Sequence, residues 1–310
     1  MRHKIILDCD PGHDDAIALL LAAHHPDLEL LAVTTVAGNQ SVEKTAHNAL
    51  KICSLAHIRT IPVAMGMDRP LLRPPHYAAD IHGESGLDGP DIPEPDIELA
   101  PQHGVDLLIE LLLKSEGDIT LVHTGPLTNL AMAIRREPAI VPKIKAISLM
   151  GGAIGVGNTT PAAEFNIWFD PEAAAIVFGC GRPLTMVPLE VTHQALATPE
   201  ILQRLRVSGR RVPSFAADLL VFFADTYLKV FGFAHPPVHD PCAVAAVIDP
   251  DVLQAQRMHV EIETRGEWTT GRTVCDVYRK PDDESDIRVG YALDVPRFWD
   301  IVISTLLSYD

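Results

Sequence analysis

The chain has 310 residues, 47% of them hydrophobic, which is enough to bury a large core. Its 25 Lys and Arg residues stand against 41 Asp and Glu residues, and the formal net charge of −16 argues against nucleic acid and anionic membranes as partners. No stretch approaches about 18 uninterrupted apolar residues and no signal-peptide core precedes the first aspartate, so we expect a cytoplasmic protein that acts on a neutral or cationic small molecule.

Apolar segments typical of buried strands alternate with helical patterns over the N-terminal part of the chain. Strands are predicted at 4–10, 28–38, 60–66, 118–125, 144–152 and 183–189, and helices at 14–25, 41–56, 103–115, 127–136 and 171–178. This alternation is typical of βαβ units, and strands that are apolar throughout indicate a sheet covered by helices on both sides. The expected fold class is therefore α/β, with a Rossmann-like, open and mostly parallel sheet flanked by helices.

The C-terminal part has a different pattern, in which helices are followed by short strand-like segments. Helices are predicted at 198–207, 213–231 and 239–248, strand-like segments at 258–264, 272–278 and 286–293, and a last helix at 295–308. There is no internal repeat and no low-complexity linker. Residues 1–310 are therefore predicted to form a single domain with a helical and small β C-terminal section.

Residues 67–101 interrupt the pattern, since they are rich in Pro and Gly and show no sustained period. A loop of this length in a compact domain is usually functional or disordered. Its centre, "HGESGLDG" (82–89), offers a hinge over a pocket, and His82 would reach a ligand there only when the loop closes. The alternative is that His82 is a solvent-exposed loop residue.

Four aspartates lie close together at the end of the first predicted strand, in "LDCDPGHDDA" (7–16). Desolvated carboxylates at such spacing repel one another, which raises pKa values and costs stability unless a cation or hydrogen bonds compensate. In open α/β sheets the ligand binds beyond the carboxyl ends of the strands. The other residues expected to gather at that edge are Asn39, Thr124, Met150, Asn158, Glu164, Asn166, His239 and Asp240.

These residues form a set rich in hard oxygen ligands, without a thiolate set or an H-x-x-x-H pair, which indicates Ca²⁺ or Mg²⁺ rather than zinc. Asp10, Asp15 and Asp240, with the carbonyl of Thr124, would leave coordination positions for water and a substrate diol. Oxygens donated from distant parts of the chain suit calcium better than magnesium. The alternative, helix N-capping by Asp14 and Asp15, explains two of the four clustered aspartates at most.

Several segments that follow one another along most of the chain carry a family resemblance. They are "DCDPGHDDAIALLLA", "TTVAGNQ", "IHGESGLDG", "TGPLTNLAMA", "LMGGA", "AEFNIWFDPEAA", "THQALATP" and "VHDPCAVA". Together they resemble the inosine-uridine nucleoside hydrolase family, which cleaves the glycosidic bond of ribonucleosides. The resemblance implies a nucleoside substrate, a homodimer or homotetramer, and one Ca²⁺ per subunit that is held by Asp10, Asp15, the Thr124 carbonyl and Asp240.

Cleavage of an N-glycosidic bond passes through an oxocarbenium-like transition state, which clustered carboxylates stabilise. Ca²⁺ is a weaker Lewis acid than Zn²⁺, so a calcium-bound water needs a base, and Asp10 is the candidate. Asp10, Asp14 and His239 are the expected catalytic residues. The resemblance further assigns the ribose 2′- and 3′-hydroxyls to Asp14, Asn39 and Asn166 and the 5′-hydroxyl to Asn158 and Glu164, with Met150 and Phe165 also lining the substrate site.

Contacts to the nucleobase are expected from histidine and aromatic residues. His239 is the candidate acid for the departing base, and the alternative is that it only orients Asp240. Tyr227 and Phe231 are expected to contact the base, although packing into the core explains them equally well. A more polar side chain is expected at these positions in pyrimidine-preferring members, so the sequence favours acceptance of both purine and pyrimidine nucleosides, with pyrimidine specificity as the alternative.

Two other classes of protein remain open at this stage. The Asp8-x-Asp10 pair after a strand superficially matches a Mg²⁺-dependent phosphatase of the haloacid-dehalogenase type, but Pro11 and Gly12 follow where that family has a different turn. A calcium-dependent, non-catalytic nucleoside-binding protein is the second rival. Release of inorganic phosphate would support the phosphatase, and release of free ribose would support the hydrolase over the binding protein.

Overall fold

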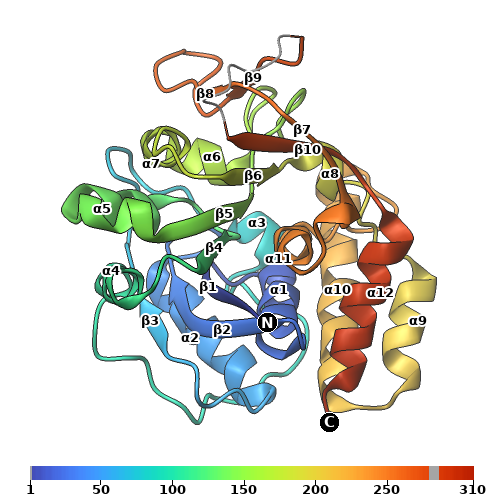
Figure 1. Cartoon of the computed structure of the whole chain (residues 1–310). Helices are drawn as coiled ribbons and strands as arrows, with labels where there is room; N and C mark the ends of the chain where they lie inside the picture. The colour runs from blue at the N-terminus through green and yellow to red at the C-terminus, as the bar shows by residue number, and fades with distance from the viewer. Residues whose placement is uncertain (1, 279–285) are drawn as a thin grey trace.

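A mostly parallel sheet runs through the centre of the computed structural model, which describes residues 2–278 and 286–310 (Figure 1). The strand order is β3-β2-β1-β4-β5-β6-β10-β7, and every neighbouring pair is parallel except β10 and β7. These strands are β1 (His3–Cys9), β2 (Leu28–Thr35), β3 (Val63–Met65), β4 (Ile119–His123), β5 (Ile144–Met150), β6 (Leu184–Val187), β7 (Leu253–Arg257) and β10 (Ile287–Leu293). The predicted α/β fold is confirmed.

Helices cover both faces of the sheet, because alternate side chains of a strand point to opposite sides. In β1, Ile5 and Leu7 are buried in one core and Ile6 is buried in the other. The first core includes α1 (His13–His24), α2 (Val42–Leu55), α11 (Pro241–Ile248) and α12 (Val295–Ser308), and the second includes α4 (Gly104–Lys114), α5 (Thr128–Arg136) and α7 (Pro171–Phe178).

The C-terminal section differs in part from the prediction. The helices and strands expected near 198–207, 213–231, 258–264 and 272–278 are present as α9 (Pro199–Val207), α10 (Arg211–Phe231), β8 (Val260–Ile262) and β9 (Thr273–Cys275). In the structure α9 and α10 pack with α12, and β8 and β9 form a small antiparallel pair (Figure 1). The segment predicted at 286–293 is not part of that small sheet, because it is β10 and lies between β6 and β7 in the central sheet. β7 is not predicted from its sequence, since only its first residue is fully buried at the sheet edge.

Several short elements also escape prediction, because three to six residues are too few to display a helical period. They are α3 (Ala79–His82), η1 (Pro138–Lys143), α6 (Phe165–Phe169), α8 (Leu189–Thr192) and η2 (Pro250–Val252). No helix within residues 2–278 and 286–310 has both the length and the apolarity needed to cross a membrane.

Residues 67–101 form the long irregular segment that was expected, interrupted by α3. Hydrogen bonds tie its Gly-rich part to the N-terminal half of the protein. Gln40 Nε2 donates to the carbonyl of Gly83 at 2.8 Å, and Asn48 Nδ2 donates to the carbonyls of Pro11 and Ser85 at 3.0 and 2.9 Å. His82 is already buried in this arrangement, so no closing movement is needed to bring it to the ligand pocket.

Candidate active site

The site lies where the strand order reverses. The chain runs outward from β1 to β2 and β3 and then returns to place β4 on the other side of β1. Asp8 and His123 are partners in the β1–β4 ladder, and the Thr124 amide donates to the Asp8 carbonyl at 2.9 Å. The residues that follow these two strands, Asp10 and Thr124, are therefore brought together at the switch point, where open α/β sheets bind ligands.

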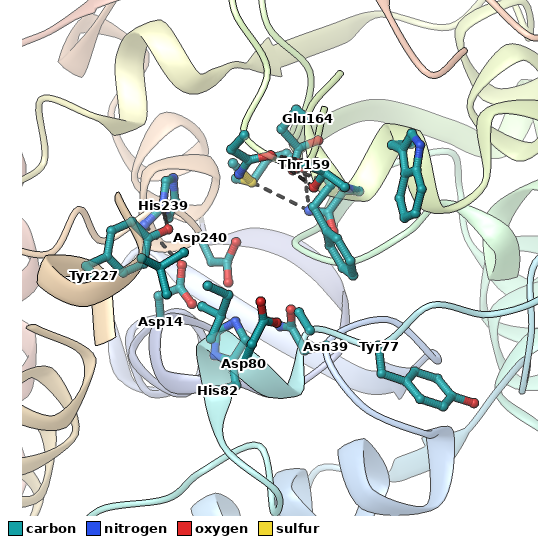
Figure 2. A pocket seen from close by; sticks show the side chains of 18 of the residues that line it. Asp14, Asn39, Tyr77, Asp80, His82, Thr159, Glu164, Tyr227, His239 and Asp240 are labelled. Atoms are coloured by element: carbon teal, nitrogen blue, oxygen red, sulfur yellow. Dashed lines mark hydrogen bonds between the residues drawn. The ribbon is translucent and has the colours of Figure 1, made fainter. Parts of the chain in front are cut away.

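A cavity of about 320 Å³ opens at this edge, which is within the range of small-molecule pockets (Figure 2). Most residues predicted for the site line it: Asp14, Asn39, His82, Thr124, Met150, Asn158, Glu164, Phe165, Asn166, Tyr227, Phe231, His239 and Asp240. Asp10 and Asp15 lie behind the wall and are fully buried. Lining residues that sequence reasoning missed include Phe223 and Trp168. Phe223 precedes Tyr227 by one helical turn, and this spacing was the available signal.

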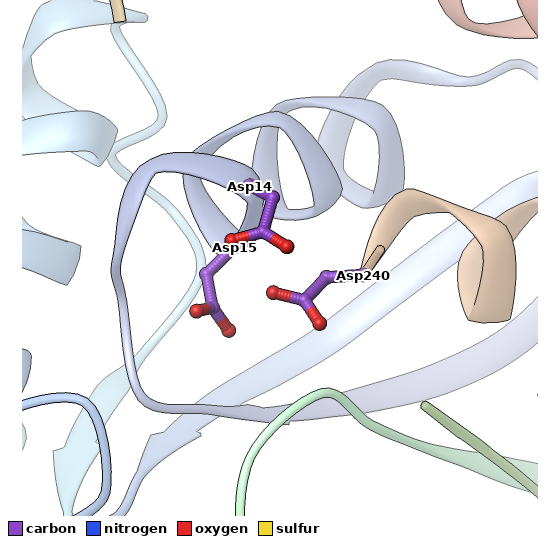
Figure 3. A group of neighbouring side chains, drawn as sticks. All are labelled: Asp14, Asp15 and Asp240. Atoms are coloured by element: carbon purple, nitrogen blue, oxygen red, sulfur yellow. The ribbon is translucent and has the colours of Figure 1, made fainter. Parts of the chain in front are cut away.

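Three carboxylates converge on one point at the base of the pocket (Figure 3). Asp14 and Asp15 come from the first turn of α1, and Asp240 comes from the residue before α11. Each offers an oxygen that lies within 4.8 Å of the others, and all three side chains are buried. The spacing is suitable for a shared cation, as the sequence predicts for Asp15 and Asp240.

Asp10 lies beside this group rather than within it. Its Oδ2 accepts a hydrogen bond from the Asn39 amide at 2.7 Å, and its Oδ1 is buried without a hydrogen-bond partner among the described residues. Asn39 Nδ2 donates to the Asp10 carbonyl at 3.0 Å and to Asp15 Oδ2 at 3.1 Å, which links the two aspartates. The approach is close: a Cβ atom on Gly125 would come within 2.5 Å of Asp10 Oδ1.

Burial raises the pKa of all four aspartates, that of Asp14 to about 7. The neighbouring negative charges add to this effect, since Asp15 further raises the pKa of Asp10 and Asp14 further raises the pKa of Asp240. A divalent cation between these carboxylates would favour their charged forms, and every available donor is a hard oxygen. The orphaned Asp10 oxygen and the converging carboxylates therefore fit a bound divalent metal ion.

The side of the pocket away from α1 is built around Glu164 and Asn166. Glu164 caps α6, and its carboxylate accepts hydrogen bonds from the amides of Gly152 (2.8 Å), Asn166 (2.9 Å) and Ile167 (3.2 Å). Asn166 Nδ2 donates to the carbonyls of Thr124 (2.8 Å) and Met150 (3.1 Å). These bonds connect the ends of β4 and β5 to α6. A carbonyl oxygen has two lone pairs, so the Thr124 carbonyl can still accept a further interaction besides this bond.

The pH dependence of the free energy of unfolding tests whether the Glu164 carboxyl is buried in this arrangement. Burial raises its pKa from 4.5 to about 7, so between these values the folded protein holds a proton that the unfolded chain has lost. The free energy of unfolding should therefore fall as pH rises through this range, by up to about 3 kcal/mol from this group. Urea unfolding of the wild type and of Glu164→Gln, both with chelator, should show a shallower fall in the variant. Equal slopes would contradict the buried, titrating carboxyl.

The opposite wall contains a hydrogen-bonded pair, Tyr227 from α10 and His239 (Figure 2). The Tyr227 hydroxyl is 2.7 Å from His239 Nε2, and Thr192 Oγ1 is 2.7 Å from His239 Nδ1. Burial lowers the pKa of His239 to about 3, so its ring is neutral at pH 7. On the same wall, His82 stacks on Phe223 with a ring-centroid distance of 5.4 Å.

The fold and this pocket define the class of protein: an α/β enzyme with a buried, carboxylate-rich site at the switch point of its sheet. The family model for the inosine-uridine preferring nucleoside hydrolase matches residues 5–300. The chain belongs to this family, whose members hydrolyse the N-glycosyl bond of ribonucleosides.

Individual relatives agree over almost the whole length. The pyrimidine-specific ribonucleoside hydrolase RihB of Escherichia coli K12 is 44% identical over 308 residues, which cover 99% of this chain and 98% of RihB. The structure of a purine-preferring ribonucleoside hydrolase from Gardnerella vaginalis is 33% identical, with a TM-score of 0.93 and coverage of 99% and 98%. An inosine-uridine preferring hydrolase from Bacillus anthracis is 25% identical, with a TM-score of 0.78 and 99% coverage of both chains.

These findings decide between the classes of protein left open by the sequence. The chain is a ribonucleoside hydrolase, so the interpretations as a phosphatase and as a non-catalytic binding protein are not supported. The family and the acidic cluster also support a metal-dependent site that takes a small nucleoside.

Proposed function

We propose that the enzyme binds one calcium ion and hydrolyses both purine and pyrimidine ribonucleosides to the free base and ribose. The observation that carries this proposal is the group of buried carboxylates of Asp14, Asp15 and Asp240, with the unpaired Oδ1 of Asp10 beside it. In a protein interior without a counterion, these negatively charged carboxylates would repel one another. Its stability is best explained by a cation that is present whenever the enzyme works.

Asp10, Asp15, Asp240 and the carbonyl of Thr124 would hold the ion. All four donors are oxygens, and they come from three distant parts of the chain, which suits the irregular, high-coordination shell of Ca²⁺ better than the strict octahedron of Mg²⁺. When bound, the ion would supply positive charge that holds the ribose diol and makes a neighbouring water more acidic.

The ribose would lie between the two polar walls of the pocket. Asp14, Asn39 and Asn166 are available to the 2′- and 3′-hydroxyls, and Glu164 with Asn158 to the 5′-hydroxyl. Asp10 Oδ1, which has no partner in the described chain, would accept the proton of the attacking water while Asn39 holds Oδ2. The surrounding carboxylates stabilise the positive charge that develops on the sugar as the bond to the base breaks.

The departing base would receive its proton from the Tyr227–His239 pair. Because His239 is neutral, one of its nitrogens donates and the other accepts. With Nε2–H donating to the Tyr227 oxygen and Nδ1 accepting from Thr192, the Tyr227 hydroxyl is free to donate into the pocket, which it lines. His239 would then hold the hydroxyl at the position from which the base is protonated.

Acceptance of both base types is supported by the wall opposite the ribose. Phe223, Tyr227 and Phe231 line it from one face of α10. Aromatic faces stack on purines and pyrimidines alike, because every base has a π face. A second candidate is pyrimidine specificity, which is favoured by the 44% identity to RihB, a pyrimidine-specific enzyme.

The remaining proposals concern the whole molecule. We propose a single domain, since β10 and β7 belong to the central sheet and α12 packs on α1. A homodimer or homotetramer and a cytoplasmic location remain predictions.

A substrate panel tests the proposed function. Free ribose is measured from inosine, adenosine, uridine and cytidine at equal enzyme concentration, with chelator and then with added Ca²⁺ or Mg²⁺. We expect kcat/KM values within about tenfold of one another for inosine and uridine, loss of turnover with chelator, and better recovery with Ca²⁺ than with Mg²⁺. Turnover of uridine and cytidine alone would establish the second candidate, and turnover unaffected by chelation would contradict the metal site.

A further inference from the structure

We propose that Thr273, on the small β8–β9 sheet, is a positioning residue that aligns Glu164 with the substrate 5′-hydroxyl. The inference rests on the proposed contact between Glu164 and that hydroxyl. It assigns a role to a part of the chain that lies outside the central sheet (Figure 1). Thr273 is not among the residues that line the pocket.

Thr273 is bonded on both sides of its hydroxyl to one residue of the loop after β5. Its Oγ1 accepts a hydrogen bond from the Ala153 amide at 2.9 Å and donates to the Ala153 carbonyl at 2.6 Å. The side chain is buried, with 1% of its surface exposed. A hydroxyl is required here, because a group without both donor and acceptor would leave one or both of these buried backbone groups unpaired.

The next residue toward β5 makes the connection to the pocket. The Gly152 amide donates to Glu164 Oε2 at 2.8 Å, so the position of the 152–153 segment sets where that carboxylate lies. Gly152 has φ +76°, and a Cβ atom there would meet the Thr273 methyl group at 2.8 Å. Thr273 therefore packs directly on this segment as well as bonding to it.

The far end of the same loop has its own support. The Glu190 carboxylate accepts from the amides of Ile154 and Gly155 at 3.0 and 2.8 Å. Thr273 thus holds the half of the loop that touches Glu164, and Glu190 holds the half that does not. Glu164 accepts hydrogen bonds from the amides of Gly152, Asn166 and Ile167, and a carboxylate has about four acceptor positions, so one is left for a ligand hydroxyl. Displacement of Gly152 would turn that position away from the ligand.

The test is a comparison of Thr273→Val with wild type on two substrates, inosine and 5′-deoxyinosine, which lacks only the 5′-hydroxyl. Valine has the shape of threonine, but it breaks both bonds to Ala153 and brings a methyl group too close to the carbonyl. We expect kcat/KM for inosine to fall by about tenfold or more and kcat/KM for 5′-deoxyinosine to change by less than about twofold. Thr273→Ser, which keeps the hydroxyl, should recover most of the loss on inosine.

Controls separate this role from a general effect on folding. Thr305→Val removes another buried hydroxyl, which donates to the Ile301 carbonyl at 2.9 Å within α12. This variant should leave kcat/KM for both inosine and 5′-deoxyinosine unchanged. If Thr273→Val does not fold, Thr273→Ala removes the same hydroxyl without adding a methyl group and is measured on the same pair. Equal losses on inosine and 5′-deoxyinosine would overturn the inference. Wild-type enzyme that does not distinguish the two substrates would instead overturn the proposed contact between Glu164 and the 5′-hydroxyl.

Discussion

Asp10→Asn is expected to lower kcat for inosine by about 10³-fold while changing the binding of ribose much less. The variant removes the proton acceptor but keeps the hydrogen bond that orients the side chain, because the amide oxygen can still accept from Asn39. The new amide group would take the place of Oδ1, which has no partner in the described residues. Turnover is measured as free ribose at saturating Ca²⁺, and ribose affinity by competition.

Saturating Ca²⁺ is essential to this experiment, since Asp10 is also a proposed ligand and the variant is expected to bind the ion more weakly. Asp27→Asn, at an exposed position after α1, serves as the matched control and should leave kcat unchanged. Turnover of Asp10→Asn within a few-fold of wild type would remove Asp10 as the base.

The second large effect is expected at the Tyr227–His239 pair. Tyr227→Phe and His239→Ala should each reduce kcat/KM for inosine by about 10²-fold, because the departing hypoxanthine needs a proton. A nitrophenyl riboside has a leaving group that departs without protonation, so its hydrolysis should fall by only a few-fold. The ratio of kcat/KM for inosine to kcat/KM for the nitrophenyl riboside separates proton donation from packing, because only proton donation affects the two substrates differently.

A matched control for the tyrosine is available on β10. Tyr291→Phe removes a hydroxyl from a side chain that is 45% exposed, and kcat/KM should stay unchanged for both substrates. Equal losses on inosine and on the nitrophenyl riboside would mean that His239 only orients Asp240, the alternative that the sequence left open.

Much of the fold and most of the site follow from local sequence. The alternation of apolar strands and helices predicts the parallel sheet. The polar residues after the strands predict which side chains line the pocket, because the carboxyl ends of parallel strands lie at one edge of the sheet. Asp14, Thr124 and Asp240 illustrate this, since they come from three distant segments and all reach the cavity. These motifs can be recognised in the sequence because each is a continuous segment. The sheet topology that brings them together is common to open α/β folds.

Tertiary structure alone decided the features that depend on pairing between distant segments. The insertion of β10 between β6 and β7, the bond between Tyr227 and His239, and the contact of Thr273 with Ala153 have no local signature. The apolar residues of a strand indicate that it is buried, but they do not indicate which strand it pairs with. A hydroxyl group can form hydrogen bonds, but the sequence does not indicate its partner. The sequence by itself thus determined the chemistry available to this enzyme, and only packing at long range determined which groups meet to use it, because hydrogen bonds depend on distances that local preference does not set.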